Sequence, residues 1–207
     1  MSWYGRHVLP RALCWACSTP GIMEVRRRVA PLACGRVLEI GAGGGLNFPF
    51  YRREAISDLH GLDPSPELSA RTVRAASALG LPLRMHEGVA EALPFDDVAF
   101  DAVVCTFTLC SVRSPAAALD EVRRVLRPGG RLLFAEHGLA PDVAVARWQR
   151  RLDPMWKRLA GGCHLSRHAP TALSSAGFAL DMQEGYVAGA PRIAGWCAVG
   201  SALSASR

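Results

Sequence analysis

The sequence predicts an α/β fold in which a doubly wound, seven-stranded and mostly parallel sheet is covered by helices on both faces. Short apolar runs alternate with longer amphipathic stretches along the chain, which is the pattern of βα units. Half of the 207 residues are hydrophobic and a fifth are charged, as in a packed globular domain. Right-handed crossovers between successive parallel strands then place helices on both faces of the sheet.

Seven apolar runs are the expected strands. Most are separated by helical stretches, which favours a parallel sheet. Between the last two lies only a loop with glycine and proline, at 185–191, which predicts an antiparallel hairpin at one edge. The runs cover residues 36–40, 57–62, 82–87, 100–107, 131–135, 178–182 and 193–199.

Amphipathic stretches bounded by glycine or proline are the expected helices. Residues 1–35 are a helical lead-in that could close over a ligand as a lid, and residues 36–207 are the expected ligand-binding domain. At this length we expect the two parts to form a single domain. The expected helices cover residues 21–33, 46–53, 66–79, 115–126, 143–159 and 168–175.

The helix expected at 143–159 carries two further signals. Asp153-Pro154 is expected to break or kink it, because proline cannot continue the helical hydrogen bonding. Trp148, Trp156 and Trp196 could line an apolar pocket, but the eight-residue spacing of the first two is more typical of a helix face packed in the core.

Charge limits the kinds of partner. The chain has 24 basic and 18 acidic residues, a net charge of +6 and a pI near 9.2. Its arginines are scattered, and the short runs at 26–28 and 150–151 are interpreted as solvated faces, so we expect no nucleic-acid partner. No apolar run approaches the ~18 residues of a membrane-spanning helix, and the N-terminus lacks the layout of an export signal. We therefore expect a cytoplasmic protein that acts on a small molecule.

Cysteine usage points to a reducing compartment. Seven is an odd number, and several cysteines lie in apolar stretches where a reduced, buried thiol is usual. Cys14-x-x-Cys17 lacks the second pair that is typical of a zinc site, so we expect no metal. The cysteines in apolar stretches are Cys34, Cys105, Cys110 and Cys197.

An apolar run that leads directly into glycines is the strongest local signal for a ligand. Residues 37–46 read VLEIGAGGGL. Gly41, Gly43 and Gly45 at a strand-to-helix turn allow positive φ and close approach of a ligand, and the helix expected after them offers free N–H groups. We therefore expect this loop to hold a nucleotide-like ligand.

Two acidic residues indicate which ligand that is. Glu39 can pair with a cationic amino group, directly or through water, but cannot help to bind a pyrophosphate. A dinucleotide fingerprint would also need glycine in place of Leu46. Asp63 ends the second apolar run, where a carboxylate can accept both ribose hydroxyls. The pattern favours S-adenosylmethionine, and a nicotinamide-dependent oxidoreductase is the alternative of a different class.

The motifs and their order resemble those of class I S-adenosylmethionine-dependent methyltransferases. This resemblance spans residues 37–137 and implies a Rossmann-like methyltransferase fold. It rests on Glu39-x-Gly41-x-Gly43-x-Gly45, on Asp63, and on the segments 88–95 (GVAEALPF), 100–104 (FDAVV) and 124–130 (RVLRPGG).

The same resemblance implies a set of cofactor contacts. The glycines would contact the methionine and ribose parts, Glu39 the ammonium end, and Ala90 and Glu91 the adenine. Val89 stands where many relatives have Asp, so adenine recognition would rest more on backbone and apolar contacts. The implied cofactor-binding residues are Glu39, Gly41, Gly43, Gly45, Asp63, Pro64, Ala90, Glu91, Cys105 and Thr106.

Further motifs resemble a narrower family, which includes membrane-anchored thiol S-methyltransferases and soluble bacterial members. We expect no counterpart in this sequence of the hydrophobic membrane anchor of the animal relatives. The resemblance implies methyl transfer to a thiol; a phospholipid amine or quinone-like acceptor, or a cofactor-binding protein without catalysis, are the alternatives. The motifs are 4–11 (YGRHVLPR), 104–112 (VCTFTLCSV), Glu136-His137, 148–156 (WQRRLDPMW) and 162–167 (GCHLSR).

Methyl transfer from a sulfonium is an in-line displacement, so alignment and exclusion of water matter most. A thiol with an ordinary pKa of ~8.5 is mostly protonated at neutral pH, and a nearby imidazole would help to ionise it. His137 is the first catalytic candidate because it follows the fifth expected strand, at the edge where doubly wound sheets bind ligands. His7 and Tyr4, in the lead-in, are the second.

Overall fold

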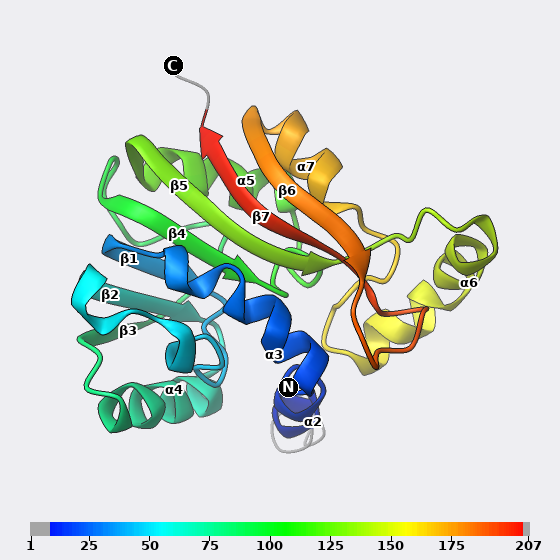
Figure 1. Cartoon of the computed structure of the whole chain (residues 1–207), viewed down its shortest axis with the longest axis horizontal. Helices are drawn as coiled ribbons and strands as arrows, with labels where there is room; N and C mark the ends of the chain where they lie inside the picture. Colours follow the sequence, from blue (N-terminus) through cyan, green and yellow to red (C-terminus); the bar gives the residue numbers. More distant parts are fainter. Residues whose placement is uncertain (1–8, 205–207) are drawn as a thin grey trace.

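The computed structural model describes residues 9–204, which form a central sheet with helices against both faces (Figure 1). The strand order is β3-β2-β1-β4-β5-β7-β6, and neighbouring strands are parallel except where β7 pairs with β5 and β6. The expected doubly wound sheet with an antiparallel edge hairpin is therefore confirmed. The strands are β1 (Gly35–Ile40), β2 (Ile56–Asp63), β3 (Leu83–Glu87), β4 (Phe100–Thr106), β5 (Leu126–His137), β6 (Phe178–Tyr186) and β7 (Trp196–Ser204).

Two helices begin at serine N-caps. Ser65 before α4 and Ser114 before α5 each precede a proline, and their hydroxyl oxygens accept a backbone N–H from the first turn of the helix, at 3.3 Å in both cases. The helices are α2 (Leu9–Ala16), α3 (Pro20–Arg27), α4 (Pro66–Ala78), α5 (Pro115–Val125), α6 (Val143–Leu159) and α7 (Ala169–Ser175).

Strand β4 shows how both faces of the sheet are buried. Val103 and Cys105 point into a core cluster that contains the apolar residues of α5, while Ala102 and Val104 point to the opposite face and join a cluster around Phe48. Alternate residues of a strand face opposite sides, so a strand buried on both faces reads as a continuous apolar run. This is why the sequence located β4 well.

The lead-in packs against the carboxyl end of the sheet. Val25 and Val29 belong to a core cluster with Ala135 of β5 and Val199 of β7. Helix α2 lies beside the glycine loop, since a Cβ built on Gly44 would be 3.0 Å from the sulfur of Cys14. The lead-in is therefore close to the residues expected to hold a ligand.

Two expected helices differ in the structure. Residues 46–53 form only 3₁₀ turns, at Phe48–Phe50 and Arg53–Ala55. Glycines before this segment and proline within it disfavour an α-helix, and the short turns bury Phe48 and Tyr51 in the core. The helix expected at 21–33 ends at Arg27 and is followed by a 3₁₀ turn at Ala30–Leu32, because proline at position 31 cannot continue it.

Helix α6 differs from two expectations. It runs through Pro154 to Leu159, so the aspartate-proline pair does not break it, and a kink at this pair stays a prediction. Trp148 is 55 % exposed and Trp156 36 %, so their interpretation as a core face was wrong. Figure 1 shows why: α6 projects away from the sheet and has no second layer packed over its outer face. Across residues 9–204, no helix is long and apolar enough to cross a membrane.

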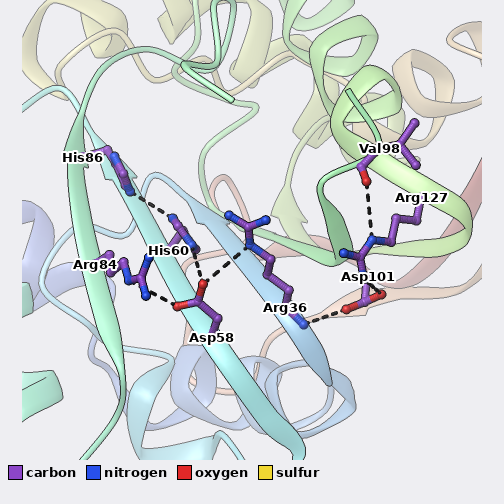
Figure 2. Close-up of polar contacts among 8 residues, drawn as sticks. All are labelled: Arg36, Asp58, His60, Arg84, His86, Val98, Asp101 and Arg127. Carbon is purple, nitrogen blue, oxygen red and sulfur yellow. Dashed lines mark hydrogen bonds and ion pairs between the residues drawn. The ribbon is translucent and has the colours of Figure 1, made fainter. Parts of the chain in front are cut away.

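A cluster of charged groups and imidazoles links β1, β2 and β3 (Figure 2). Arg36, Asp58 and Arg84 lie towards the amino ends of these strands, and His60 and His86 lie farther along them. The carboxylate of Asp58 lies 3.6 Å from Nε of both Arg36 and Arg84, and 2.9 Å from Nε2 of His60. His60 Nδ1 is 3.0 Å from His86 Nε2. Burial alone would raise the pKa of Asp58, but His60 and the two arginines lower it. No pattern in the sequence predicted this cluster.

The carboxylate of Asp101, at the start of β4, is also held by donors of the same chain (Figure 2). Its Oδ2 accepts the backbone N–H of Arg36 at 2.7 Å, and its Oδ1 accepts Nη1 of Arg127 at 2.7 Å. These donors outweigh the effect of burial, so the pKa of Asp101 is lowered. The amino edge of the sheet thus pairs its carboxylates with cations of the same chain.

Candidate active site

The glycine loop follows β1 and lies against the end of β2. Gly41, Gly43 and Gly45 have φ values of 66°, 54° and 75°, which favour glycine. A Cβ on Gly41 would be 2.2 Å from Oγ1 of Thr108, so a side chain is also excluded there by space. The N–H of Gly41 donates to the carbonyl of Leu62 at 2.8 Å, which fixes the loop to β2.

Asp63, the last residue of β2, is bound to that loop. The N–H of Gly43 donates to Oδ2 and the N–H of Ser65 to Oδ1, both at 2.9 Å. Burial raises the pKa of this carboxyl, and the two backbone donors act against the rise. The two oxygens have further lone pairs, so the carboxylate can accept additional donors such as a pair of hydroxyls.

Glu39 lies in β1 and is only 2 % exposed. Asn47 Nδ2 donates to Oε1 at 2.9 Å, and the hydroxyl of Tyr51 donates to Oε2. Burial raises the pKa of Glu39 to about 7, although Tyr51, Arg26 and Asn47 each lower it in part. Because ionisation of this carboxyl is so finely balanced, a nearby cationic ligand would favour its charged form.

Arg26 of α3 is buried in the same network, with 5 % of its surface exposed. Its Nη1 donates to Thr106 Oγ1 at 2.6 Å and to Asn47 Oδ1 at 3.0 Å, and its guanidinium lies 5.0 Å from the centre of the Phe107 ring. The interpretation of residues 26–28 as a solvated face was therefore wrong at Arg26. The contact between Arg26 and Thr106 joins the lead-in to the end of β4.

Glu136 shapes the turn after β4. Its carboxylate accepts the N–H groups of Thr108 at 2.7 Å, Leu109 at 3.0 Å and Cys110 at 3.3 Å. Phe107, just before this turn, has a φ of 54° although it is not glycine. A strained residue held by a buried carboxylate is a feature of functional turns.

His137 ends β5 and faces the same turn. Its ring stacks on that of Phe107 with centroids 6.4 Å apart, and Nε2 is 3.1 Å from Sγ of Cys163. Burial would lower the pKa of His137, but the Cys163 thiol and Glu136 reverse the shift and raise it. The hydrogen-bonded thiol of Cys110, together with burial, raises the pKa of Cys163 well above its ordinary value.

A cavity of about 70 Å³ opens beside His137. It is apolar apart from a few polar groups, as small-molecule sites are. Its lining residues are Leu109, Cys110, Pro115, His137, Arg167, His168, Ala169 and Ala172.

The remaining expected site residues are placed differently. Pro64 is exposed, and Cys105 is fully buried with its thiol 3.5 Å from Glu136. Ala90 is buried in the core, while the Glu91 carboxylate accepts the N–H groups of residues 113 and 114 and so holds the chain before α5. Tyr4 and His7 lie outside the described residues.

Comparison with known proteins agrees with this geometry. Residues 38–134 match the family described as "Methyltransferase domain". The chain is 34 % identical over 160 residues to demethylmenaquinone methyltransferase of Thermus thermophilus. The match covers 72 % of this chain and 73 % of that protein. The chain belongs to the S-adenosylmethionine-dependent methyltransferases. Its expected cofactor is accordingly S-adenosylmethionine, the donor that gives the family its name.

Two further likenesses concern this methyltransferase. It is 37 % identical over 147 residues to thiol S-methyltransferase TMT1B of Rattus norvegicus, a match to 69 % of this chain and 59 % of that protein. The chain thus spans about six-tenths of that relative's length. A solved S-adenosylmethionine-dependent methyltransferase from Thermotoga maritima shares the fold, with a TM-score of 0.68, 17 % identity and coverage of 97 % of this chain and 99 % of that one.

Proposed function

We propose that the protein transfers the methyl group of S-adenosylmethionine to a small thiol. The observation that carries this proposal is the group of buried carboxyls, Glu39 and Asp63, that flank a glycine loop with positive φ angles. Such a site suits a ligand with one cationic end and one hydroxyl-bearing sugar. The likeness to a thiol S-methyltransferase supports a thiol as acceptor.

In this proposal the cofactor lies along the carboxyl ends of β1 and β2. Its ammonium end faces the network of Glu39, and its ribose hydroxyls donate to Asp63. Thr106, at the end of β4, and Ala90 flank the cofactor through backbone and apolar contacts. Gly43, where a built Cβ would meet only the carbonyl oxygen of Gly41 at 3.7 Å, would let the cofactor approach the loop backbone, while Gly41 and Gly45 make room for Thr108 and Phe48.

The acceptor occupies the cavity beside His137, at the carboxyl ends of β4 and β5. Sulfur attacks the methyl carbon in line with the departing cofactor sulfur, so the S–CH₃ bond of the acceptor forms as that of the sulfonium breaks. His137 promotes loss of the acceptor proton. The lead-in, whose Arg26 already reaches Thr106, would cover the cofactor.

A quinone-like carbon acceptor is the second candidate, because the protein is also similar to a demethylmenaquinone methyltransferase over most of that protein's length. A carbon acceptor would need a larger apolar space than about 70 Å³. A phospholipid amine is less well suited to a cavity that already contains the cationic side chain of Arg167.

The deciding experiment incubates the chain with labelled S-adenosylmethionine and a panel of thiols, amines and quinols. We expect label in alkyl thiols, and thermal stabilisation by S-adenosylmethionine but not by a nicotinamide dinucleotide. Label only in quinols would replace the thiol proposal, and tight cofactor binding with no labelled product would indicate a non-catalytic protein.

His137→Ala tests the acceptor end separately. Loss of a group that assists proton removal is expected to lower kcat/KM for a thiol by roughly 10²-fold, while the Kd for the cofactor stays as in the wild type. His168→Ala is the matched control, since His168 also lines the cavity but caps α7. Equal losses in both variants would assign no special role to His137.

A further inference from the structure

Two thiols and an imidazole from separate elements meet beside the acceptor cavity. Cys110 lies in the turn after β4, His137 ends β5, and Cys163 follows α6. Their potential ligand atoms all lie within 4.8 Å of one another. A backbone hydrogen bond of 2.8 Å from the N–H of His164 to the carbonyl of Cys110 holds the two cysteine segments together.

The local backbone is built to deliver Cys163 to this position. Gly161 and Gly162 before it have φ values of 64° and 93°, so the chain turns sharply as α6 ends. A Cβ on Gly162 would lie 3.4 Å from the carbonyl oxygen of Ser111, which shows how closely the turn approaches the segment of Cys110. The convergence is therefore fixed by the backbone of both segments.

The donor set has the chemistry of a soft-metal site. Two cysteine sulfurs and one histidine nitrogen, with no carboxylate among them, are ligands that Zn²⁺ prefers. The sulfurs also have neighbouring donors: Trp156 Nε1 donates to Cys163 Sγ at 3.4 Å, and Ser111 Oγ lies 3.5 Å from Cys110 Sγ. Groups of this kind orient metal ligands in known sites.

We propose that Cys110, His137 and Cys163 bind one Zn²⁺ ion whose fourth position is open to the acceptor cavity. Cys110 and His137 both line that cavity, which gives the ion an entry path. Zinc sites with three protein ligands keep the fourth position for water or substrate. The expectation of no metal rested on Cys14-x-x-Cys17, which lacks a second pair. The three residues proposed here are 26 or more positions apart, so no spacing in the sequence pointed to them.

The ion would also explain how the acceptor is activated, and this part rests on the proposed function. Cys110, His137 and Cys163 would hold the ion, and the ion would supply the charge that favours the thiolate form of a bound thiol, whose proton would leave to solvent. In this arrangement His137 would promote deprotonation as a ligand of the ion.

The test titrates Co²⁺ into the chelator-treated full chain, kept reduced with a phosphine. We expect the near-ultraviolet absorption of sulfur-to-cobalt charge transfer, saturating at one ion per chain and removed by Zn²⁺. Cys110→Ser and Cys163→Ser should weaken binding by roughly 10²-fold or more. Cys197→Ser, which changes a buried thiol outside the cluster, should bind like the wild type. Absence of the absorption, or its retention in both cluster variants, would overturn the site.

A second measurement uses only the wild type, in case a variant does not fold. Zn²⁺ should slow alkylation of Cys110 and Cys163 relative to the metal-free chain, and leave that of the exposed Cys34 unchanged. Equal rates with and without Zn²⁺ would overturn the proposal. Thiol methylation by a chain that binds no Co²⁺ would reject the metal site alone, whereas Co²⁺ binding without methylation of any thiol would reject the proposed function alone.

Discussion

The two edges of the sheet differ in how their carboxyl groups are surrounded. At the amino edge, Asp58 and Asp101 contact arginines of the same chain, and their pKa values are lowered (Figure 2). At the carboxyl edge, Glu39, Asp63 and Glu136 are 5 % exposed or less, and burial raises their pKa values. Their neighbours are mostly backbone N–H groups and neutral side chains.

This difference separates stability from function. Carboxylates paired with cations add to stability at neutral pH, whereas buried carboxyls with raised pKa values cost stability when they ionise. Arg26 balances only part of the charge at the carboxyl edge. A cationic cofactor would supply the rest, which is why perturbed groups gather where the ligand is expected.

Replacing one glycine at each edge by alanine should give the largest difference in the free energy of unfolding. Gly41→Ala is expected to cost about 2–4 kcal/mol, since the positive φ is strained and the new Cβ would overlap Thr108. Gly80, which precedes β3, also has a positive φ but no atom within 4 Å of a built Cβ, so Gly80→Ala should cost about 1–2 kcal/mol. Urea unfolding measures both. Equal losses would show that Thr108 does not restrict the loop.

Removal of one aspartate from each edge should separate binding from stability. Asp63→Ala is expected to weaken S-adenosylmethionine binding by roughly 10- to 150-fold, the equivalent of ~1.5–3 kcal/mol for charged hydrogen bonds. Asp101→Ala should lower the free energy of unfolding and leave the cofactor Kd unchanged. Calorimetric titration and urea unfolding of both variants check this, and an unchanged Kd in Asp63→Ala would contradict the ribose assignment.

The pH dependence of stability should have opposite signs for Glu39 of the ligand loop network and for His86 of the Asp58 cluster, with slopes of at most about 1.4 kcal/mol per pH unit for each group. Folded Glu39 holds its proton up to about pH 7, above its ordinary value of 4.5, so its contribution to stability falls as pH rises between these values. His86 has a pKa lowered by burial and by His60, so its contribution falls as pH drops below 6.5.

Difference curves isolate the two contributions. The free energy of unfolding of the unliganded Glu39→Gln and His86→Gln variants, minus that of the wild type, should change with pH in opposite directions. Curves with the same slope would mean that Glu39 and His86 do not differ in this way.

The sequence predicted the parts of the site that are local. The glycine loop, Asp63 and the strand ends are each encoded by neighbouring residues, and each pattern predicts one backbone conformation. By contrast, Arg26 and Thr106 are 80 residues apart in the sequence, and His137 and Cys163 are 26 apart. No local spacing predicts either contact. The helix expected at 46–53 failed because the apolar spacing of Phe48 and Tyr51 serves a tight turn as well as a helix.

Proton release on cofactor binding tests the central claim most directly. Titration calorimetry with S-adenosylmethionine, at about pH 6.5 in buffers of different ionisation enthalpy, counts the protons exchanged. If the cationic cofactor completes the charge balance around Glu39, whose free pKa is about 7, binding should release a proton, and Glu39→Gln should abolish most of that release. Binding without proton release, or with proton uptake, would contradict the account.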